Sequence, residues 1–382
     1  MKKVEANHVD FQKVRKRRQR VQTVKRLVAL GIVLAFIAGI VSLNRFLINA
    51  GVTIRLSDFV ESFGGAGYPI PVPGGIIQDV KSLGNDIAVI NDTNLYVYSK
   101  NGKTMLSYQH MSDQTLVETN ADRILIYNAG GRNYAILSKS KILLSNGGDY
   151  SILGGDLNGQ GAFALITASE QSASRVIVFD QKFNEMFELR SENLVSGVSI
   201  SPKGTRMAAI GVDTVGGEVC TLVWLYDFNV EKGLVKLELA GETPLDVQYL
   251  EDGRFSVLTN RQYRLFSSEG IQECSYSFSG DRVLAIERSG KQALLQLEGT
   301  GGSRLVLLDG SCAAQASVVL QDKVRDIAFG SNNIYVLSDT GITTYGTGLE
   351  PKSTFEMRGI SQIHAVKDTL YYFDKEEIHI LQ

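Results

Sequence analysis

The stretch VSISPKGTRMAAIGVDTVGGEVCTLVWLYDFNVEKGLVKLELA, residues 198–240, contains the pattern that decides the fold. It reads as apolar runs rich in β-branched and aromatic residues, separated by short polar segments that contain Gly, Pro, Asp and Asn. Two hairpins in succession make one four-stranded unit of about forty residues, the length of a propeller blade.

The first hairpin of this unit recurs along the chain beyond Ile76. When the copies are aligned, their second strands lie about forty residues apart, at Ile87, Ile124, Phe163, Met207, Phe255, Ala293, Ile334 and Leu370. A second hairpin follows each of the first seven copies, and the eighth ends in EIHILQ at residues 377–382. We therefore predict an all-β protein: a β-propeller of about eight four-stranded blades over residues 68–382, with seven blades as the alternative.

The truncated last blade lacks its outer strand, which would leave an unpaired edge. Just before the first blade lies YPIPVP, residues 68–73, which holds half of the six prolines of the chain. Proline suits only an edge strand, because it cannot donate a hydrogen bond to the ladder. We therefore predict that this segment completes the C-terminal blade; the alternative is a plain Pro-rich linker.

The N-terminal tail holds ten Lys and Arg but only two acidic residues, and residues 27–43 carry no charge. The apolar run extends to residue 48 if Arg45 snorkels outward. These features predict a basic cytoplasmic tail (1–26) and a transmembrane helix (27–48). The positive-inside rule then predicts a single-pass protein of the cell membrane, with its N-terminus cytoplasmic and its C-terminal domain extracytoplasmic. A cleavable signal peptide is the alternative.

Residues 49–67 form a predicted juxtamembrane linker that contains a short amphipathic helix. Its apolar positions are Val52, Leu56, Phe59, Val60 and Phe63, with Ser57, Asp58 and Glu61 opposite them. Such a helix either lies on the membrane or caps the propeller rim. We expect capping, since the polar side contains no Lys to attract lipid headgroups.

Charge and cysteine content restrict the partners further. Residues 44–382 hold 29 Lys and Arg against 39 Asp and Glu. A domain this acidic is not expected to bind nucleic acid. Cys274 and Cys312 fall in the outer hairpins of successive blades, where equivalent positions diverge beyond disulfide range, so we expect both to be reduced. Cys220 begins an inner strand and should be a buried apolar filler.

The chain shows no nucleophile elbow, zinc-protease helix, CxxC pair or phosphate-binding loop, so we predict no catalytic residue, metal site or cofactor. His110 and His364 are flanked by strand residues and are interpreted as ordinary blade histidines. Residues 156–161, DLNGQG, resemble the start of a calcium loop, but position twelve is Thr167 rather than Glu. A hairpin turn is the preferred interpretation.

Connections between the second and third strands of blades two, three, four and six are long or Gly-rich: NAGGRN (128–133), ASEQSAS (168–174), DTVGGEV (213–219) and EGTGGS (298–303). In a propeller these loops emerge on one face, and loops on a rigid scaffold often bind ligands. The alternative is that they are flexible, tolerated insertions. The predicted polar contacts of this candidate binding face are Arg132, Asn133, Glu170, Asp213 and Glu218.

The motifs NAGGRN, VDTVGGE and PIPVPGG, together with the basic single-span N-terminus, resemble a family of uncharacterised bacterial single-pass membrane proteins with an extracytoplasmic WD40-like β-propeller. The resemblance covers essentially the whole chain, although the Gly-His and Trp-Asp pairs of true WD40 blades are missing. It implies an outward-facing propeller and brings no catalytic residues to this sequence.

These observations predict a non-enzymatic binding or scaffold module. Its partners would be the lipid bilayer, through residues 27–48, and an extracytoplasmic protein or cell-envelope polymer. The alternative is a carbohydrate-active enzyme, a glycosidase or lyase, with paired carboxylates in the central channel.

Overall fold

The computed structural model describes residues 52–381, apart from 73, 111–113, 231–232 and 234. Residues from Asp58 onward form one compact unit, and the chain up to Ser57 forms another. The predicted cytoplasmic tail and membrane span lie outside the described residues. Within the described residues, no helix is long and apolar enough to cross a bilayer.

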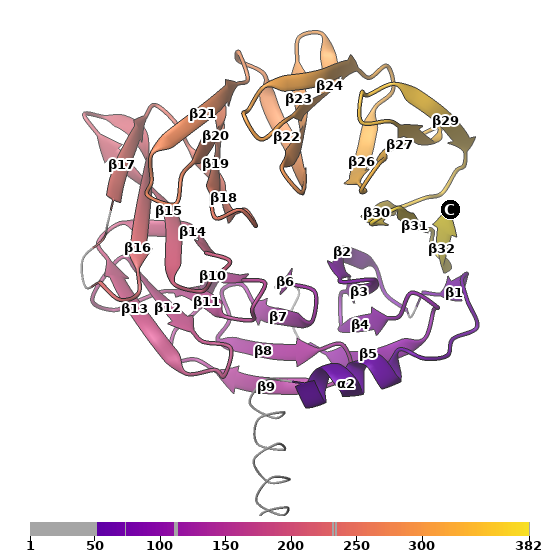
Figure 1. The fold of residues 1–382 in the computed structure, drawn as a ribbon, viewed down its shortest axis with the longest axis horizontal. Coiled ribbons are helices and arrows are strands. Elements are labelled where there is room, and N and C mark those ends of the chain that lie inside the picture. The colour runs from indigo at the N-terminus through magenta and orange to yellow at the C-terminus, as the bar shows by residue number, and fades with distance from the viewer. Residues whose placement is uncertain (1–51, 73, 111–113, 231–232, 234, 382) are drawn as a thin grey trace, which may run out of the picture. The chain divides into compact units, whose positions relative to one another are not determined.

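Eight four-stranded antiparallel sheets form a closed ring of blades (Figure 1). Blade 1 contains β2 (Ile77–Leu83), β3 (Asp86–Asn91), β4 (Asn94–Tyr98) and β5 (Thr104–Gln109). Blade 2 contains β6 (Thr115–Thr119), β7 (Arg123–Asn128), β8 (Asn133–Ser138) and β9 (Ile142–Gly147). Blade 3 contains β10 (Ile152–Leu157), β11 (Phe163–Thr167), β12 (Ser174–Phe179) and β13 (Glu185–Ser191). Blade 4 contains β14 (Leu194–Ile200), β15 (Arg206–Val215), β16 (Glu218–Asp227) and β17 (Val235–Ala240).

The second half of the ring repeats this order. Blade 5 contains β18 (Pro244–Tyr249), β19 (Phe255–Thr259), β20 (Gln262–Phe266) and β21 (Gln272–Ser277). Blade 6 contains β22 (Arg282–Ser289), β23 (Gln292–Gly299), β24 (Gly302–Leu308) and β25 (Ala314–Val319). Blade 7 contains β26 (Val324–Phe329), β27 (Ile334–Ser338), β28 (Gly341–Tyr345) and β29 (Pro351–Glu356). Blade 8 contains β30 (Gln362–Val366), β31 (Thr369–Phe373), β32 (Glu377–Leu381) and the N-terminal β1 (Ile70–Pro71). The eight-blade prediction is confirmed, and the seven-blade alternative is wrong.

The predicted closure of the ring is also confirmed. β1 pairs antiparallel with β32, with Ile70 opposite Ile378, and the backbone N–H of Val72 donates to Glu376 O over 2.8 Å. Because β1 pairs on one side only, neither Pro71, within the strand, nor the preceding Pro69 costs a ladder hydrogen bond. Ile70 is buried against blades 8 and 1, so the strand also contributes apolar packing.

The hydrophobic core lies between the blades. Buried apolar side chains of the described residues form eight clusters, and each cluster joins two neighbouring blades around the ring. The second strands β3, β11, β19 and β27 are buried along their whole length. The outermost strands alternate or are exposed, as in β17 and β29. Each blade therefore needs both neighbours to bury its two faces.

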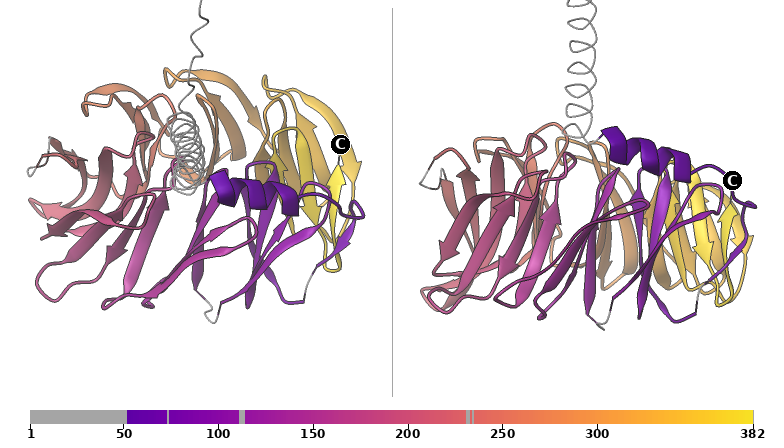
Figure 2. Two further views of the ribbon diagram at one scale, coloured as in Figure 1. Left: turned by 60° about the horizontal axis from the view of Figure 1, so that its bottom comes forward. Right: turned by 90° about the horizontal axis from the view of Figure 1, so that it is seen from below.

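Because the strands of each blade are consecutive and antiparallel, alternate connections emerge on opposite faces of the ring (Figure 2). We call one face the hairpin face. It carries the turns between the first and second strands and between the third and fourth strands of each blade. The opposite face is the loop face, which carries the connections between the second and third strands and the connections from one blade to the next.

The predicted short helix is α2 (Val52–Glu61). Its residues from Asp58 onward contact the hairpin face: the carboxylate of Asp58 accepts hydrogen bonds from the hydroxyls of Ser138 (3.0 Å) and Ser140 (2.5 Å). Glu61 forms an ion pair with Lys103 at 3.0 Å. The expected contact with the propeller rim is therefore present, but the polar side of the helix makes it.

The prediction of three free thiols is wrong. Cys274 and Cys312 form a disulfide, with Cα atoms 5.8 Å apart. Cys274 lies in the outer strand β21 of blade 5, whereas Cys312 lies in the turn between β24 and β25 of blade 6. The two positions are not equivalent, and the blade 6 turn reaches back to the neighbouring outer strand. Cys220 is a free, buried thiol as expected.

Candidate functional site

The five residues of the predicted binding face all lie on or near the loop face, in three consecutive blades. Arg132 and Asn133 belong to the β7–β8 connection and the start of β8, and Glu170 to the β11–β12 loop. Asp213 and Glu218 are strand residues rather than loop residues, because β15 and β16 remain paired as far as Val215 and Glu218. The turn between them is Gly216–Gly217, both with positive φ, which suits a two-residue hairpin turn.

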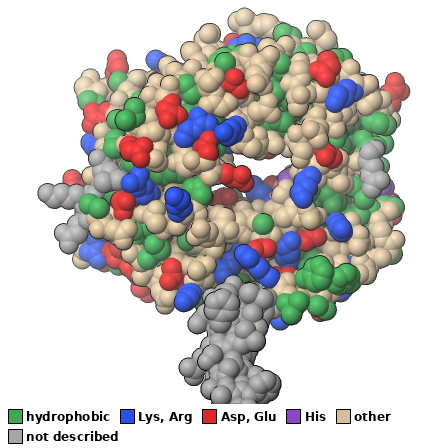
Figure 3. All heavy atoms as spheres, in the orientation of Figure 1, with side chains coloured by type: hydrophobic (Ala, Val, Ile, Leu, Met, Phe, Trp, Pro, Cys, Tyr) green, Lys and Arg blue, Asp and Glu red, His purple; other side chains and the backbone are tan. Residues whose placement is uncertain are grey.

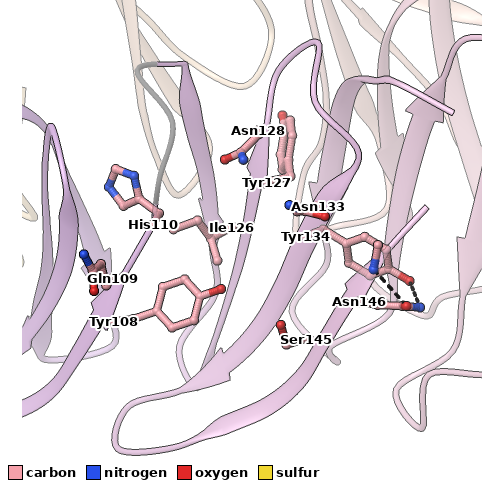
Figure 4. A pocket seen from close by; sticks show the side chains of 11 residues that line it. Tyr108, Gln109, His110, Ile126, Tyr127, Asn128, Asn133, Tyr134, Ser145 and Asn146 are labelled. Atoms are coloured by element: carbon pink, nitrogen blue, oxygen red, sulfur yellow. Dashed lines mark hydrogen bonds between the residues drawn. The ribbon is translucent and has the colours of Figure 1, made fainter. Parts of the chain in front are cut away.

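A cavity of about 530 Å³ opens between blades 1 and 2 on the loop face (Figure 4). Of the five predicted residues, Asn133 lines it. No lining residue among those that the structure describes is Asp, Glu, Lys or Arg. We call it the tyrosine–amide cavity, and its described lining residues are Tyr108, Gln109, His110, Ile126, Tyr127, Asn128, Asn133, Tyr134, Ser145, Asn146 and Gly147.

His110 fixes one wall of this cavity. The side chain is buried, its Nε2 lies 3.0 Å from Asn91 O, and its Nδ1 lies 2.9 Å from the Thr115 hydroxyl. Because both ring nitrogens already have partners inside the protein, His110 has a structural role, as predicted. The opposite wall is set by Tyr134, whose hydroxyl accepts a hydrogen bond from Asn146 Nδ2 over 3.2 Å.

A second, smaller cavity of about 240 Å³ lies between blades 2 and 3 on the same face. It shares Tyr134, Asn146 and Gly147 with the first, so the two cavities adjoin. Its other lining residues include Arg175, whose guanidinium pairs with Glu188 at 2.9 Å. The loop face of blades 1 to 3 therefore contains two adjoining cavities. The tyrosine–amide cavity has uncharged walls, and the smaller cavity has charged residues in its walls.

One equivalent position in the innermost strand of each blade lies beside the central channel, and the sequence alone did not reveal it. In each blade this residue pairs with the residue that follows the alignment point of the second strand; in blade 1, for example, Lys81 pairs with Ala88, which follows Ile87. Figure 3 shows acidic, basic and histidine side chains around the opening. We call these residues the channel ring: Lys81, Glu118, Asp156, Ser199, Gln248, Glu287, Ala328 and His364.

The channel environment disfavours charge on the carboxyls and the histidine of this ring. Lys81 is the exception: burial alone would lower its pKa, but the carboxylates of Asp79 and Glu118 raise it. Burial, and then the nearby carboxylate of Asp156, raise the pKa of Glu118 to about 7. Burial also raises the pKa of Asp156 and of Glu287, each to about 7. Burial lowers the pKa of His364 to about 4, and its Nε2 lies 2.9 Å from the Ser82 hydroxyl. His364 is thus a neutral blade histidine near pH 7, as predicted.

Two of the inner carboxylates join neighbouring blades. Asp156 of blade 3 accepts a hydrogen bond from the backbone N–H of Ile200 in blade 4 over 2.6 Å. Asp326 of blade 7 accepts one from Ile363 in blade 8 over 2.9 Å. The sequence gives a weak sign of these positions, because Asp precedes an aliphatic residue in both innermost strands. Only the pairing across blades reveals their partners.

The turn predicted over residues 156–161 is confirmed. Asn158 closes it: its side-chain oxygen accepts from the N–H groups of Gln160 (3.0 Å) and Ala162 (2.9 Å). Its Nδ2 also donates to Ser201 O in the next blade over 2.9 Å. Among the described residues, no group of three or more His, Cys, Asp or Glu is placed to hold a metal ion.

Comparison with known families gives one match over most of the chain. A model described as a family of unknown function (DUF5711) matches residues 76–381. No curated protein matches the sequence.

Solved propellers resemble the fold. BamB from Moraxella catarrhalis is 11% identical, with a TM-score of 0.51, over 82% of this chain and 100% of that one. Apo AztD from Citrobacter koseri is 12% identical, with a TM-score of 0.54, over 81% and 89%. Kluyveromyces lactis Hsv2 is 10% identical, with a TM-score of 0.52, over 74% and 99%. At such low identity the likeness shows the fold alone.

Proposed function

The chain belongs to the DUF5711 family, whose function is unknown, and we propose a function for it from the geometry of its loop face. The protein is a non-enzymatic binding module that residues 27–48 anchor in the cell membrane. Its propeller lies on the extracytoplasmic side and binds another extracytoplasmic protein or a polymer of the cell envelope.

The tyrosine–amide cavity is the observation that carries this proposal. Tyrosine combines a flat apolar ring with a hydroxyl, and carboxamides both donate and accept hydrogen bonds. Such walls suit a chain of neutral polar units, whether sugar rings or peptide groups. They offer nothing to a phosphate backbone, in agreement with the acidic composition of the domain.

The position of the cavity supports the same function. It opens on the loop face, whereas Asp58 and Glu61 fix the incoming chain to the hairpin face. The loop face is therefore the face opposite to the one that Asp58 and Glu61 contact. The adjoining charged cavity extends the available surface across a third blade.

Site-specific photocrosslinking of the full-length protein in cells tests this function. A photoreactive residue at the exposed Asn133 should capture one defined partner, and the same residue at the exposed Lys182, in the β12–β13 turn of the hairpin face, is the matched control. With the photoreactive residue kept at position 133, Gln109→Ala and Asn146→Ala, both exposed, should weaken capture at least five-fold together while leaving the melting temperature unchanged. Equal capture at both positions, or full capture by the double variant, would contradict the proposal.

A second candidate function is the carbohydrate-active enzyme, and the channel ring is the observation that favours it. A general acid needs a pKa near the working pH, and Glu118 meets this condition beside a second carboxylate, Asp156 of the next blade. This candidate predicts that the full-length protein releases new reducing ends from isolated cell-wall polysaccharide. It also predicts that Glu118→Gln and Asp156→Asn abolish the release. Capture at Asn133 without any release would favour the binding module.

A further inference from the structure

The helix α2 presents its apolar side to solvent. Phe59, Val60 and Phe63 are 59%, 58% and 59% exposed, and Leu56, one turn earlier in the same helix, is 60% exposed. The rings of Phe59 and Phe63 pack edge-to-face with centroids 4.7 Å apart. Amphipathic helices of soluble domains normally bury this side against the core, so an outward apolar side indicates an interaction surface.

Polar contacts hold this segment in place. Asp58 is only 5% exposed and is bound by two serine hydroxyls of the β8–β9 turn. Beyond the helix, the N–H of Gly67 donates to Asn101 O over 3.0 Å, and Gly65, with φ of +110°, passes so close to Asn101 O that a Cβ there would collide with it. The outward direction of the phenylalanines is therefore fixed by hydrogen bonds on both sides, of which the one between Asp58 and Ser138 is buried.

Basic side chains surround the apolar patch. The β4–β5 and β8–β9 turns that receive α2 carry Lys100, Lys103, Lys139 and Lys141. Lys103 pairs with Glu61 and Lys139 with Asp86, while Lys100 and Lys141 are exposed. Figure 3 shows hydrophobic and basic side chains side by side over this part of the hairpin face. The lysines that the helix itself lacks are thus supplied by the propeller.

We propose that the patch of Phe59, Val60 and Phe63 inserts into the interface of a bilayer containing anionic lipid, with Lys100 and Lys141 against the headgroups. An exposed aromatic cluster beside lysines matches the boundary between acyl chains and headgroups. The inference rests on the proposed membrane anchor, because only three residues separate the end of the apolar run at residue 48 from the start of α2, about 14 Å of extended chain at most. The bilayer is therefore the surface nearest to the patch.

This insertion would set the orientation of the whole propeller. The hairpin face would lie against the membrane and the loop face would point away from it. Lysines near an anionic surface add electrostatic attraction to this insertion. The tether also keeps the patch at a high effective concentration near the membrane.

Tryptophan quenching in the full-length protein tests the proposal. Phe59→Trp is reconstituted into vesicles of phosphatidylcholine and phosphatidylglycerol that contain lipids brominated high on the acyl chain. The wild-type protein supplies the background, because its single Trp224 is buried in blade 4. The matched control is Val215→Trp, an exposed apolar position on the loop face. We expect at least twofold more quenching at position 59 than in the wild type, and wild-type quenching at position 215.

Further variants and measurements separate the outcomes. Lys100→Gln with Lys141→Gln should reduce quenching at position 59 on anionic vesicles and leave it unchanged on neutral ones. If Phe59→Trp expresses poorly, Phe63→Trp replaces it. No added quenching at position 59 overturns the proposal, and a concentration-dependent blue shift without quenching would assign the patch to a second copy. Flotation with the vesicles reports the anchor separately, so a floating but unquenched protein contradicts this inference and not the proposed function.

Discussion

At the scale of single residues, the disulfide is the contact that sequence reasoning placed wrongly. Repeat spacing predicts equivalent positions for Cys274 and Cys312, but Cys274 lies in a strand and Cys312 in a turn. A turn can nevertheless reach across the groove between two outer strands, and the Cα separation then falls within disulfide range.

Thiol labelling of the denatured, unreduced protein should therefore find one reactive group, Cys220. Reduction should lower the free energy of unfolding by about 2–4 kcal/mol, because the bond closes a loop across a sequence separation of 38 residues. Cys312→Ser should have the same effect as reduction, and reduction should have no further effect on that variant. A count of three thiols would contradict the bond.

The buried carboxyl of Asp156 makes the stability of the protein depend on pH. Its pKa is raised by burial to about 7 in the folded protein, against about 3.9 when unfolded. The folded state therefore binds the extra proton between these values, so this carboxyl makes folding less favourable as the pH rises from about 4 to 7. His364, with its lowered pKa, acts in the opposite direction between about pH 4 and 6.5 and is common to wild type and variant.

The stability difference between Asp156→Asn and wild type isolates this effect. From pH 5 to pH 8 the variant should gain about 1–3 kcal/mol relative to wild type, measured by urea unfolding at each pH. The amide keeps an oxygen that can accept from the Ile200 N–H. The exposed Glu218→Gln serves as control and should track the wild type. A constant difference across the pH range would show that Asp156 is charged throughout.

At the scale of secondary-structure elements, the closure strand shows how a short segment can stabilise a ring. β1 contains two residues, yet it covers the edge of β32 and places Ile70 in the core between blades 8 and 1. Proline restricts this segment to an edge position, and the truncation of the last blade leaves a single free edge for it. Both facts are visible in the sequence, which is why this prediction is confirmed.

Ile70→Ala should lower the free energy of unfolding by about 2–4 kcal/mol, since a buried aliphatic side chain is removed. The matched control is Ile76→Ala, six residues later, where the side chain is 78% exposed and the change should stay within about 0.5 kcal/mol. Equal unfolding midpoints for the two variants in guanidinium chloride would show that β1 does not stabilise the ring.

At the scale of the whole molecule, two opposite faces have different chemistry. The hairpin face receives α2 and carries the lysines of two neighbouring turns. The loop face holds the tyrosine–amide cavity, the smaller charged cavity and all five residues predicted from the sequence for binding, whereas a cavity of about 660 Å³ on the hairpin face is lined by charged residues such as Lys203, Arg206 and Asp252. Asn133 lines the tyrosine–amide cavity, while Asp213 accepts a hydrogen bond from Asn193 Nδ2 over 3.0 Å and is partly buried. The β15 and β16 strands stay paired up to their two-residue turn, whereas the β11–β12 connection is a longer loop.

The proposed orientation predicts the result of limited proteolysis. A protease added to intact cells without their wall should remove the chain beyond Gly51 and leave the N-terminal tail protected. Detergent should then expose the tail to the same protease. An epitope at the C-terminus and one at the N-terminus report the two regions separately. Protection of the C-terminal epitope in intact cells would reverse the topology.

From sequence patterns alone we predicted about eight blades, the closing strand, a short helix before the propeller and the Asn158 turn. These follow from strand periodicity, turn residues and proline, which are read directly along the chain. The exact count of eight blades, the Cys274–Cys312 bond, the docking of α2 through Asp58 and the channel ring emerge only in the folded chain. Each of these depends on which residues of one blade lie against the next, and that register is set by packing between segments about forty or more residues apart.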